Sequence, residues 1–291
     1  MRVLRGLIVV ILMAGAVGKI WAQGKPEWTE PFPAFRIADN LYYVGSKDLV
    51  SYLVTTPEGD ILINSSLKSS PALIEKSVES LGFKWSDVKI LLISHAHWDH
   101  DAGSAKVVQL TGAKYMVMDA DVPVVESGGK ADFFYGKQDR YPVARVDRVL
   151  HDGDEVRLGG VVLVAHKTPG HTKGCTTWTM KVSDGGKQYD VVIVGSWNVN
   201  QGFRLVGRPG RPASYPGIAK DYERTFRVLK GLPCDIFLGA HGVYFGMLEK
   251  YGRMKAGGAN VWVDPAGYQA AVAEREAAFE KELKRQEAGG K

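Results

Sequence analysis

The sequence of 291 residues predicts an α+β fold in which two β-sheets pack face to face with helices outside. Two observations predict this architecture. In each half of the chain, short β-branched and aromatic runs come before helix-like segments, an order that fits a two-sheet sandwich better than an alternating parallel array. In addition, polar side chains able to bind metal follow directly after several apolar runs, so the ends of the predicted strands would gather them along one edge.

The first 22 residues have the pattern of a secretory signal peptide. Arg2 and Arg5 precede an apolar stretch over residues 7–17, and the small residue Ala22 stands at the predicted cleavage point. This stretch is shorter than the roughly 20 apolar residues that a membrane-spanning helix needs; a retained anchor is the alternative. We therefore expect residues 1–22 to be removed, residues 23–291 to form a single domain, and the mature protein to be periplasmic without stable membrane insertion.

The charge of the chain gives no reason to expect a nucleic-acid partner. The formal net charge is +5, and loss of residues 1–22 removes three basic residues and no acidic one, which leaves +2. Nucleic-acid binding needs a clustered basic face rather than a small net charge. We expect a monomer whose partner is a small-molecule substrate.

The two cysteines, Cys175 and Cys234, each stand beside an apolar run. We therefore expect two buried thiols. A disulfide between them is the alternative, because an oxidising compartment permits one.

The first half of the chain is rich in predicted strands. Short apolar runs separated by turn residues predict a meander, at residues 35–37, 41–44, 51–55 and 60–64. A helix is predicted over residues 71–81, with Ser70 as its N-cap and Gly82 after its end. Next along the chain we expect a strand at 89–94, a helix at 103–110 and a strand at 114–118.

The second half opens with a loop over residues 128–142 that carries Phe133, Phe134 and Tyr135 and has no clear period. Such a loop is either a lid over a site or a segment whose aromatic residues fill a small satellite core. After it we predict strands at 156–158, 161–165, 176–182, 191–194 and 235–238. Helices are predicted at 219–230, 244–255 and 265–286, the last capped by Asp264.

A cluster of metal-ligand side chains follows the apolar run at residues 90–94. Six consecutive residues contain His95, His97, Asp99 and His100, and these include three of the seven histidines in the chain. Imidazole and carboxylate are ligands that zinc prefers. The cluster therefore predicts a zinc site at the end of a rigid strand.

Three further polar residues follow apolar runs in the same way: His171, Ser196 and His241. With the cluster, the two added histidines make six ligands, too many for one tetrahedral zinc ion and suitable for two. We expect one ion to be bound by three imidazoles and the other by one carboxylate and two imidazoles, the two sets being His95, His97, His171 and Asp99, His100, His241. His151 and His166 fit no such position, and we expect them to be structural.

The motif H-x-H-x-D-H at residues 95–100 resembles that of the metallo-β-lactamase superfamily, and the ligand set resembles its third subclass. The resemblance implies a four-layer αββα sandwich, two mixed β-sheets flanked by helices, with two Zn²⁺ ions per chain. It implies hydrolysis of the amide bond of β-lactam antibiotics (penicillins, cephalosporins, carbapenems) by a zinc-bound hydroxide, and hence antibiotic resistance. Asp99 would be catalytic, and Ser196 and Asn198 would bind the substrate carboxylate.

Other hydrolases of the superfamily bridge their metals with an aspartate just after the second-half strand, where this chain has Ser196. The absence of this aspartate favours a β-lactamase over a lactonase or thioesterase. These two enzymes and a non-catalytic zinc-binding protein are the alternatives. Asn198 stands where some members carry a second serine. Trp98, larger than the usual residue, is expected to pack against other aromatics rather than narrow the mouth, and we expect the 128–142 loop and Trp197 to form an apolar wall.

Overall fold

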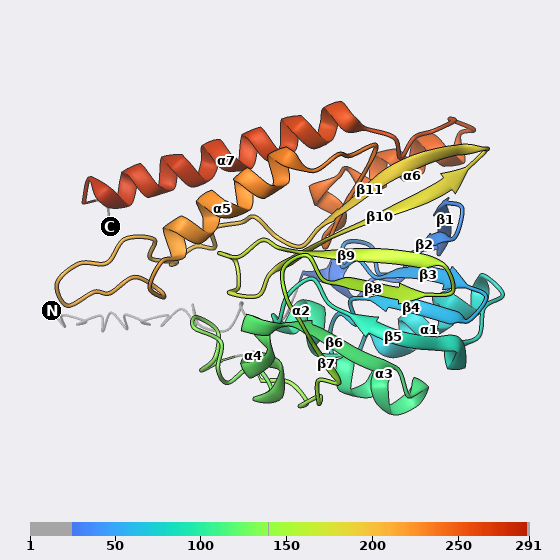
Figure 1. The fold of residues 1–291 in the computed structure, drawn as a ribbon, viewed down its shortest axis with the longest axis horizontal. Helices are drawn as coiled ribbons and strands as arrows, with labels where there is room; N and C mark the ends of the chain where they lie inside the picture. The colour runs from blue at the N-terminus through green and yellow to red at the C-terminus, as the bar shows by residue number, and fades with distance from the viewer. Residues whose placement is uncertain (1–24, 139, 290–291) are drawn as a thin grey trace, which may run out of the picture.

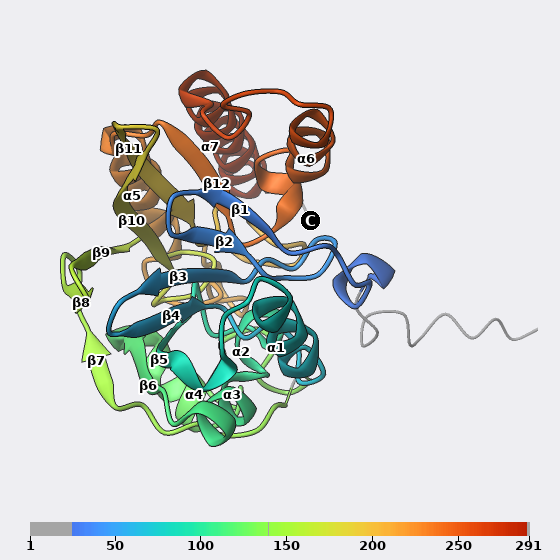
Figure 2. The same ribbon diagram turned by 90° about the vertical axis from the view of Figure 1, so that its right-hand side faces the viewer.

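A computed structural model describes residues 25–138 and 140–289, so the predicted signal peptide over residues 1–22 lies outside the described part. Two β-sheets pack against each other, and helices cover the outer face of each sheet (Figures 1 and 2). The predicted α+β sandwich with two mixed sheets and flanking helices is therefore confirmed.

The first sheet has seven strands that follow one another in chain order. The first four pair in antiparallel fashion, and the last three continue from β4 in parallel. They are β1 (Phe35–Ala38), β2 (Leu41–Tyr43), β3 (Tyr52–Thr56), β4 (Gly59–Ile63), β5 (Val88–Leu92), β6 (Lys114–Met118) and β7 (Arg148–Leu150). Helices α1 (Pro71–Ser80) and α3 (Ser104–Thr111) lie on its outer side (Figure 2).

The second sheet has five strands in the order β12-β11-β10-β9-β8, antiparallel except for the β11–β12 pair. They are β8 (Glu155–Leu158), β9 (Val161–Lys167), β10 (Thr176–Asp184), β11 (Lys187–Val194) and β12 (Ile236–Gly239). Its outer side carries α5 (Ile218–Gly231), α6 (Met247–Lys255) and α7 (Pro265–Glu287). As predicted, Asp264 caps α7 by accepting a hydrogen bond from Gly267 N at 2.9 Å.

The strand period of two divides the apolar residues between two cores. On β4, Ile61 and Ile63 belong to the core between the sheets, which also holds Trp178 of β10. Leu62 points the other way, into the core beneath the helices with Ile74 of α1. Alternate side chains of a strand point to opposite faces, so this strand is buried on both sides.

Several local predictions were incomplete. The edge strand β7 and the short helices α2 (Trp98–Asp101) and α4 (Val122–Glu126) were not predicted, nor were the 3₁₀ turns η1 (Pro26–Trp28), η2 (Trp85–Asp87) and η3 (Asp119–Asp121). The helix expected over residues 244–255 is broken, because η4 (Gly242–Tyr244) ends before Gly246, whose φ of 64° is left-handed, and α6 begins after it. Ser70 does not cap α1 through its side chain, and its Oγ accepts a hydrogen bond from Leu67 N instead.

Both cysteines are free thiols, Cys175 buried and Cys234 half-buried, so the expected thiols are found and the alternative disulfide is not. The segment from 128 to 142, apart from residue 139, is a succession of turns and irregular chain, as predicted. Over the described ranges, no helix is both long and apolar enough to cross a membrane.

Candidate metal centre

The ligand cluster lies where the chain leaves β5 and turns into α2. Asn64 Oδ1 accepts a hydrogen bond from Ser94 N at 2.7 Å and so fixes the end of the strand. His97 is the residue before α2, and its carbonyl accepts from the amides of His100 and Asp101 at 3.0 Å each. The chain thus forms a tight helical turn, which brings Asp99 and His100 back toward the strand end.

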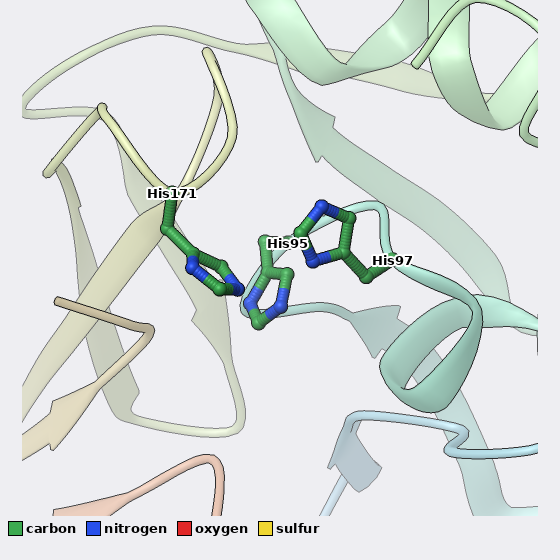
Figure 3. Close-up of side chains that lie close together, drawn as sticks. All are labelled: His95, His97 and His171. Atoms are coloured by element: carbon green, nitrogen blue, oxygen red, sulfur yellow. The ribbon is translucent and has the colours of Figure 1, made fainter. Parts of the chain in front are cut away.

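Three imidazoles meet in a first trio: His95, His97 and His171 (Figure 3). Their ligand atoms all lie within 4.8 Å of one another. His171 reaches the other two from the second sheet, because it follows β9 through Gly170, whose φ is 130°. A Cβ at position 170 would lie 2.8 Å from the Tyr222 ring, so only glycine allows this approach.

A second trio lies beside the first. Asp99 Oδ2 is 3.4 Å from His100 Nε2 and 3.6 Å from His241 Nε2, and the two imidazole nitrogens are 3.2 Å apart. His241 stands just beyond β12. The ring centroids of His95 and His100 are 4.3 Å apart, so the six expected ligands form one continuous group at the sheet edges.

The protonation states of four of these residues suit a metal cation. Burial lowers the pKa of His95, and it lowers the pKa of His100 and of His171 to about 3, so these imidazoles are neutral. Burial alone would raise the pKa of Asp99, but the surrounding imidazoles outweigh it and lower the pKa, so the carboxylate is ionised. The buried His95 Nε2 has no hydrogen-bond partner among the described residues. Neutral imidazole and carboxylate are what zinc takes as ligands, and the donor set therefore fits the metal.

Two ligands of these trios are oriented by partners behind them. His171 Nδ1 lies 2.9 Å from the Asn198 carbonyl oxygen, and His241 Nδ1 lies 3.3 Å from Asp48 Oδ2. Asp48 also accepts a hydrogen bond from Trp28 Nε1 at 3.0 Å. Such outer contacts fix the tautomer and ring orientation of a metal-binding histidine. Asp48 and Trp28 were not predicted from the sequence, because neither belongs to a spacing motif.

Asp121 joins the two ligand loops, and it too was missed. Its Oδ2 accepts from Ala96 N at 2.9 Å and from Thr172 Oγ1 at 2.8 Å, and its Oδ1 accepts from Gly174 N at 2.8 Å. Ala96 lies between two expected ligands of the first sheet, whereas Thr172 and Gly174 follow His171. One buried carboxylate thus connects the parts of the first trio that come from different sheets.

The two residues expected to bind the substrate carboxylate, Ser196 and Asn198, both contact Tyr244. The Tyr244 hydroxyl lies 3.2 Å from Ser196 Oγ and accepts a hydrogen bond from Asn198 Nδ2 at 3.0 Å. Tyr244 was not predicted as a site residue, because it was assigned to a helix. The expectation that Trp197 would form an apolar wall was wrong, since it is 1% exposed and its ring packs in the core against Phe237 and Tyr244.

The aromatic residues of the 128–142 loop divide between the two roles considered. Phe133 and Phe134 pack on Phe203, with ring centroids 5.2 and 4.8 Å away, and so extend the core. The Tyr135 ring lies perpendicular to the His97 ring, with the two centroids 5.0 Å apart, and so forms one side of the first trio. Trp98 packs against Trp28 at 5.6 Å, as expected of a packed aromatic.

His151 and His166 lie apart from both trios. His151 is exposed in the turn before β8. His166 lies on β9, where its Nε2 is 2.8 Å from Thr179 Oγ1 of the neighbouring strand.

Comparisons with known proteins agree with this geometry. A family model described as the metallo-beta-lactamase superfamily matches residues 49–241. The structure is similar to the native FEZ-1 metallo-beta-lactamase from Legionella gormanii, with 54% sequence identity, a TM-score of 0.87, and coverage of 89% of this chain and 98% of that one. It is also similar to BJP-1, a subclass B3 metallo-beta-lactamase of Bradyrhizobium japonicum, with 36% identity, a TM-score of 0.82, and coverage of 90% and 98%.

Curated relatives match a shorter part of the sequence. A hydroxyacylglutathione hydrolase of Polaromonas sp. (strain JS666) is 30% identical over 123 residues, which cover 42% of this chain and 38% of that protein. The chain thus spans less than half the length of this relative. The predicted resemblance to the superfamily and to its third subclass is confirmed by the family model and by the solved structures. The chain belongs to the metallo-beta-lactamase superfamily of hydrolases.

Proposed function

We propose that this protein is a zinc-dependent β-lactamase that opens the amide bond of β-lactam antibiotics. We propose that it uses two zinc ions, one bound by His95, His97 and His171 and the other by Asp99, His100 and His241. The observation that carries the proposal is the convergence of these six side chains, five of them buried, in a fold that matches a metallo-beta-lactamase over 98% of that chain at 54% identity. The short matches to hydroxyacylglutathione hydrolases make a thioesterase the second candidate.

Ser196 favours the first candidate over the second. It stands just after β11, where the resemblance places a metal-bridging aspartate in the other hydrolases. The Ser196 side chain is 1% exposed and its hydroxyl pairs with that of Tyr244. A serine hydroxyl is a poor substitute for a bridging carboxylate, because zinc prefers charged oxygen ligands.

Substrate binding follows from the donors beside the second trio. Ser196 and Tyr244 each have one hydroxyl proton, and Asn198 has two amide protons. The Tyr244 hydroxyl contacts both of the other groups, and the three together have more donor protons than these two contacts use. A substrate carboxylate supplies the missing acceptor, and it would be held next to His241, whose ring centroid is 5.2 Å from that of Tyr244.

The chemical step needs an activated water and a proton for the leaving nitrogen. When bound, the zinc ions polarise the carbonyl and lower the pKa of water toward neutrality. Asp99 is ionised and stands among the imidazoles of the second trio. We propose that the Asp99 carboxylate orients the attacking water, accepts its proton as the bond from oxygen to the carbonyl carbon forms, and passes that proton to the ring nitrogen as the carbon–nitrogen bond breaks.

A parallel assay tests this function. The purified protein with zinc should hydrolyse a chromogenic cephalosporin much faster than S-lactoylglutathione or an acyl-homoserine lactone, and chelation should abolish the activity. His95→Ala should be inactive, whereas the matched control His151→Ala, which removes an exposed histidine, should behave as wild type. Faster turnover of the thioester would favour the second candidate, and zinc binding without any turnover would favour a binding protein.

The cellular role rests on the N-terminal sequence. We propose that residues 1–22 direct export, that residues 23–291 form one periplasmic domain, and that expression protects a bacterium from β-lactams. Fractionation with N-terminal sequencing should find a protein that begins at Gln23 in the periplasm, and the inhibitory concentration of a penicillin should rise in cells that express it. A full-length protein in the membrane fraction would contradict the cleavage.

A further inference from the structure

Asp132 brings a carboxylate from the 128–142 loop to the first trio. Its Oδ2 lies 3.4 Å from His97 Nε2, and the two side chains are 3% and 4% exposed. Both atoms are buried and lack a hydrogen-bond partner among the described residues. A buried acceptor and a buried potential donor, each without another partner, therefore face each other just beyond the usual hydrogen-bond distance.

The loop itself holds this carboxylate in place. Asp132 Oδ1 accepts hydrogen bonds from the amides of Phe134 at 2.7 Å and Tyr135 at 2.5 Å. At Gly136 an added Cβ would lie 2.5 Å from the carbonyl oxygens of Asp132 and Lys130, so the turn closes tightly around the aspartate. Because Oδ1 is used within the loop, Oδ2 is the oxygen free to act on His97.

A carboxylate at Nε2 determines which nitrogen His97 offers to a metal. It favours the tautomer that carries the proton on Nε2, which leaves the lone pair on Nδ1. In Figure 3 the His97 ring turns one nitrogen toward His95 and the other away from it. Asp132 also stabilises positive charge on the ring, as a carboxylate behind a metal-binding imidazole does.

The loop that supplies Asp132 has further contacts with the site. Tyr135 packs on the same His97 ring, and its hydroxyl accepts a hydrogen bond from Asn200 Nδ2 at 2.9 Å. The outer partners of His171 and His241 behave differently, because Asn198 and Asp48 lie in segments next to strands of the sheets. Only the His97 contact, among those of the described ligand rings, depends on a long irregular loop.

We propose that Asp132 is a positioning residue for His97 and that it couples the order of residues 130–138 to metal binding at the first trio. The coupling is reciprocal by thermodynamic linkage. A metal ion in the trio fixes His97 and favours the observed conformation of residues 130–138, and this conformation in turn raises the affinity for the metal. The inference rests on the proposed function only in taking the trio as a zinc site.

The test compares Asp132→Asn with a matched control. Asparagine keeps an oxygen for the loop amides but removes the negative charge from His97. Asp147→Asn is the control, because Asp147 Oδ2 accepts from Tyr115 N at 2.9 Å and Asp147 has no contact with the trios in the described structure. Zinc affinity is measured by chelator competition, and loss of such an outer partner weakens binding by about 10–100-fold.

We expect this loss at one of the two zinc sites of Asp132→Asn, and affinity within about threefold of wild type for the control. Wild-type affinity in Asp132→Asn would overturn the positioning role. Hydrogen exchange of the wild-type protein provides an independent measurement if the variant does not fold. Zinc should slow exchange of the amides at residues 133–137, and unchanged exchange would overturn the coupling. Neither measurement uses a β-lactam. A lack of β-lactam turnover would therefore contradict the proposed function without affecting this inference.

Discussion

Replacing Asp121 tests whether one buried carboxylate holds the ligand loops of the two sheets together. It accepts three hydrogen bonds, from Ala96 N, Thr172 Oγ1 and Gly174 N. An unpaired buried donor costs about 1–3 kcal/mol. Asp121→Ala leaves three such donors, so we expect the free energy of unfolding to fall by about 4–6 kcal/mol, a large part of the roughly 5–15 kcal/mol typical of a folded domain.

Two milder variants separate the parts of this effect. In Asp121→Asn one oxygen can still accept from Ala96 and Thr172, but the amide nitrogen would face the Gly174 N–H group. We expect a loss of about 2–4 kcal/mol, because one donor is left facing another donor. Thr172→Val removes a donor and leaves the carboxylate its other two bonds, so the expected loss is about 1 kcal/mol.

Urea unfolding of the metal-free proteins at neutral pH, followed by circular dichroism, measures these differences. Stability should decrease in the order wild type, Thr172→Val, Asp121→Asn, Asp121→Ala. Zinc affinity should fall in the same order, because Ala96 and Thr172 adjoin the histidines of the first trio. The reasoning fails if Asp121→Ala loses less than about 1 kcal/mol, or if Thr172→Val costs as much as Asp121→Ala.

Three further predictions concern metal, substrate and pH. His241→Ala should lower the zinc content from two ions per chain to about one, as measured by atomic emission on the dialysed protein. Tyr244→Phe should raise KM for a β-lactam about tenfold while kcat changes less than threefold, because one hydrogen bond to a charged group is worth about 1.5–3 kcal/mol; an unchanged KM would exclude the contact. Burial raises the pKa of Asp60 from 3.8 to about 6, so the folded state binds this proton more tightly than the unfolded state. Stability due to this group therefore falls as the pH rises from about 4 to about 6, and Asp60→Asn should flatten thermal unfolding midpoints across that range and raise the midpoint at pH 7.

Local signals explain what could be predicted from the sequence. The strand Lys114–Met118 was predicted with its observed bounds, because Gly112 ends the helix before it and its residues are strand formers. The long helix α7 was placed by its cap at Asp264 and by Pro265 in its first turn. The expected ligands stand together because each follows a strand end, and strand ends of the two sheets share one edge of the fold.

Residues that act through tertiary contact could not be predicted in this way. Asp48, Asp121 and Asp132 are single acids in irregular segments or short turns, and in sequence they resemble the many acids that are simply solvated. Only the fold shows that each is buried and near donors from distant segments. Edge strand β7 was missed for a related reason, because three residues with one buried side chain carry too little pattern.

The second trio shows how Asp99 differs from these supporting acids. Asp48 lies near the Trp28 N–H group and His241 Nδ1, and Asp121 accepts from three donors. Because Asp48 lies at His241 Nδ1, the other ring nitrogen, His241 Nε2, is the one that faces the ionised Asp99, 3.6 Å away. His100 Nε2 is 3.2 Å from the same nitrogen, and at most one proton can lie between the two imidazoles. A cation among these groups would stabilise the buried carboxylate, which supports the proposal that Asp99 is a ligand and that the other acids support the site.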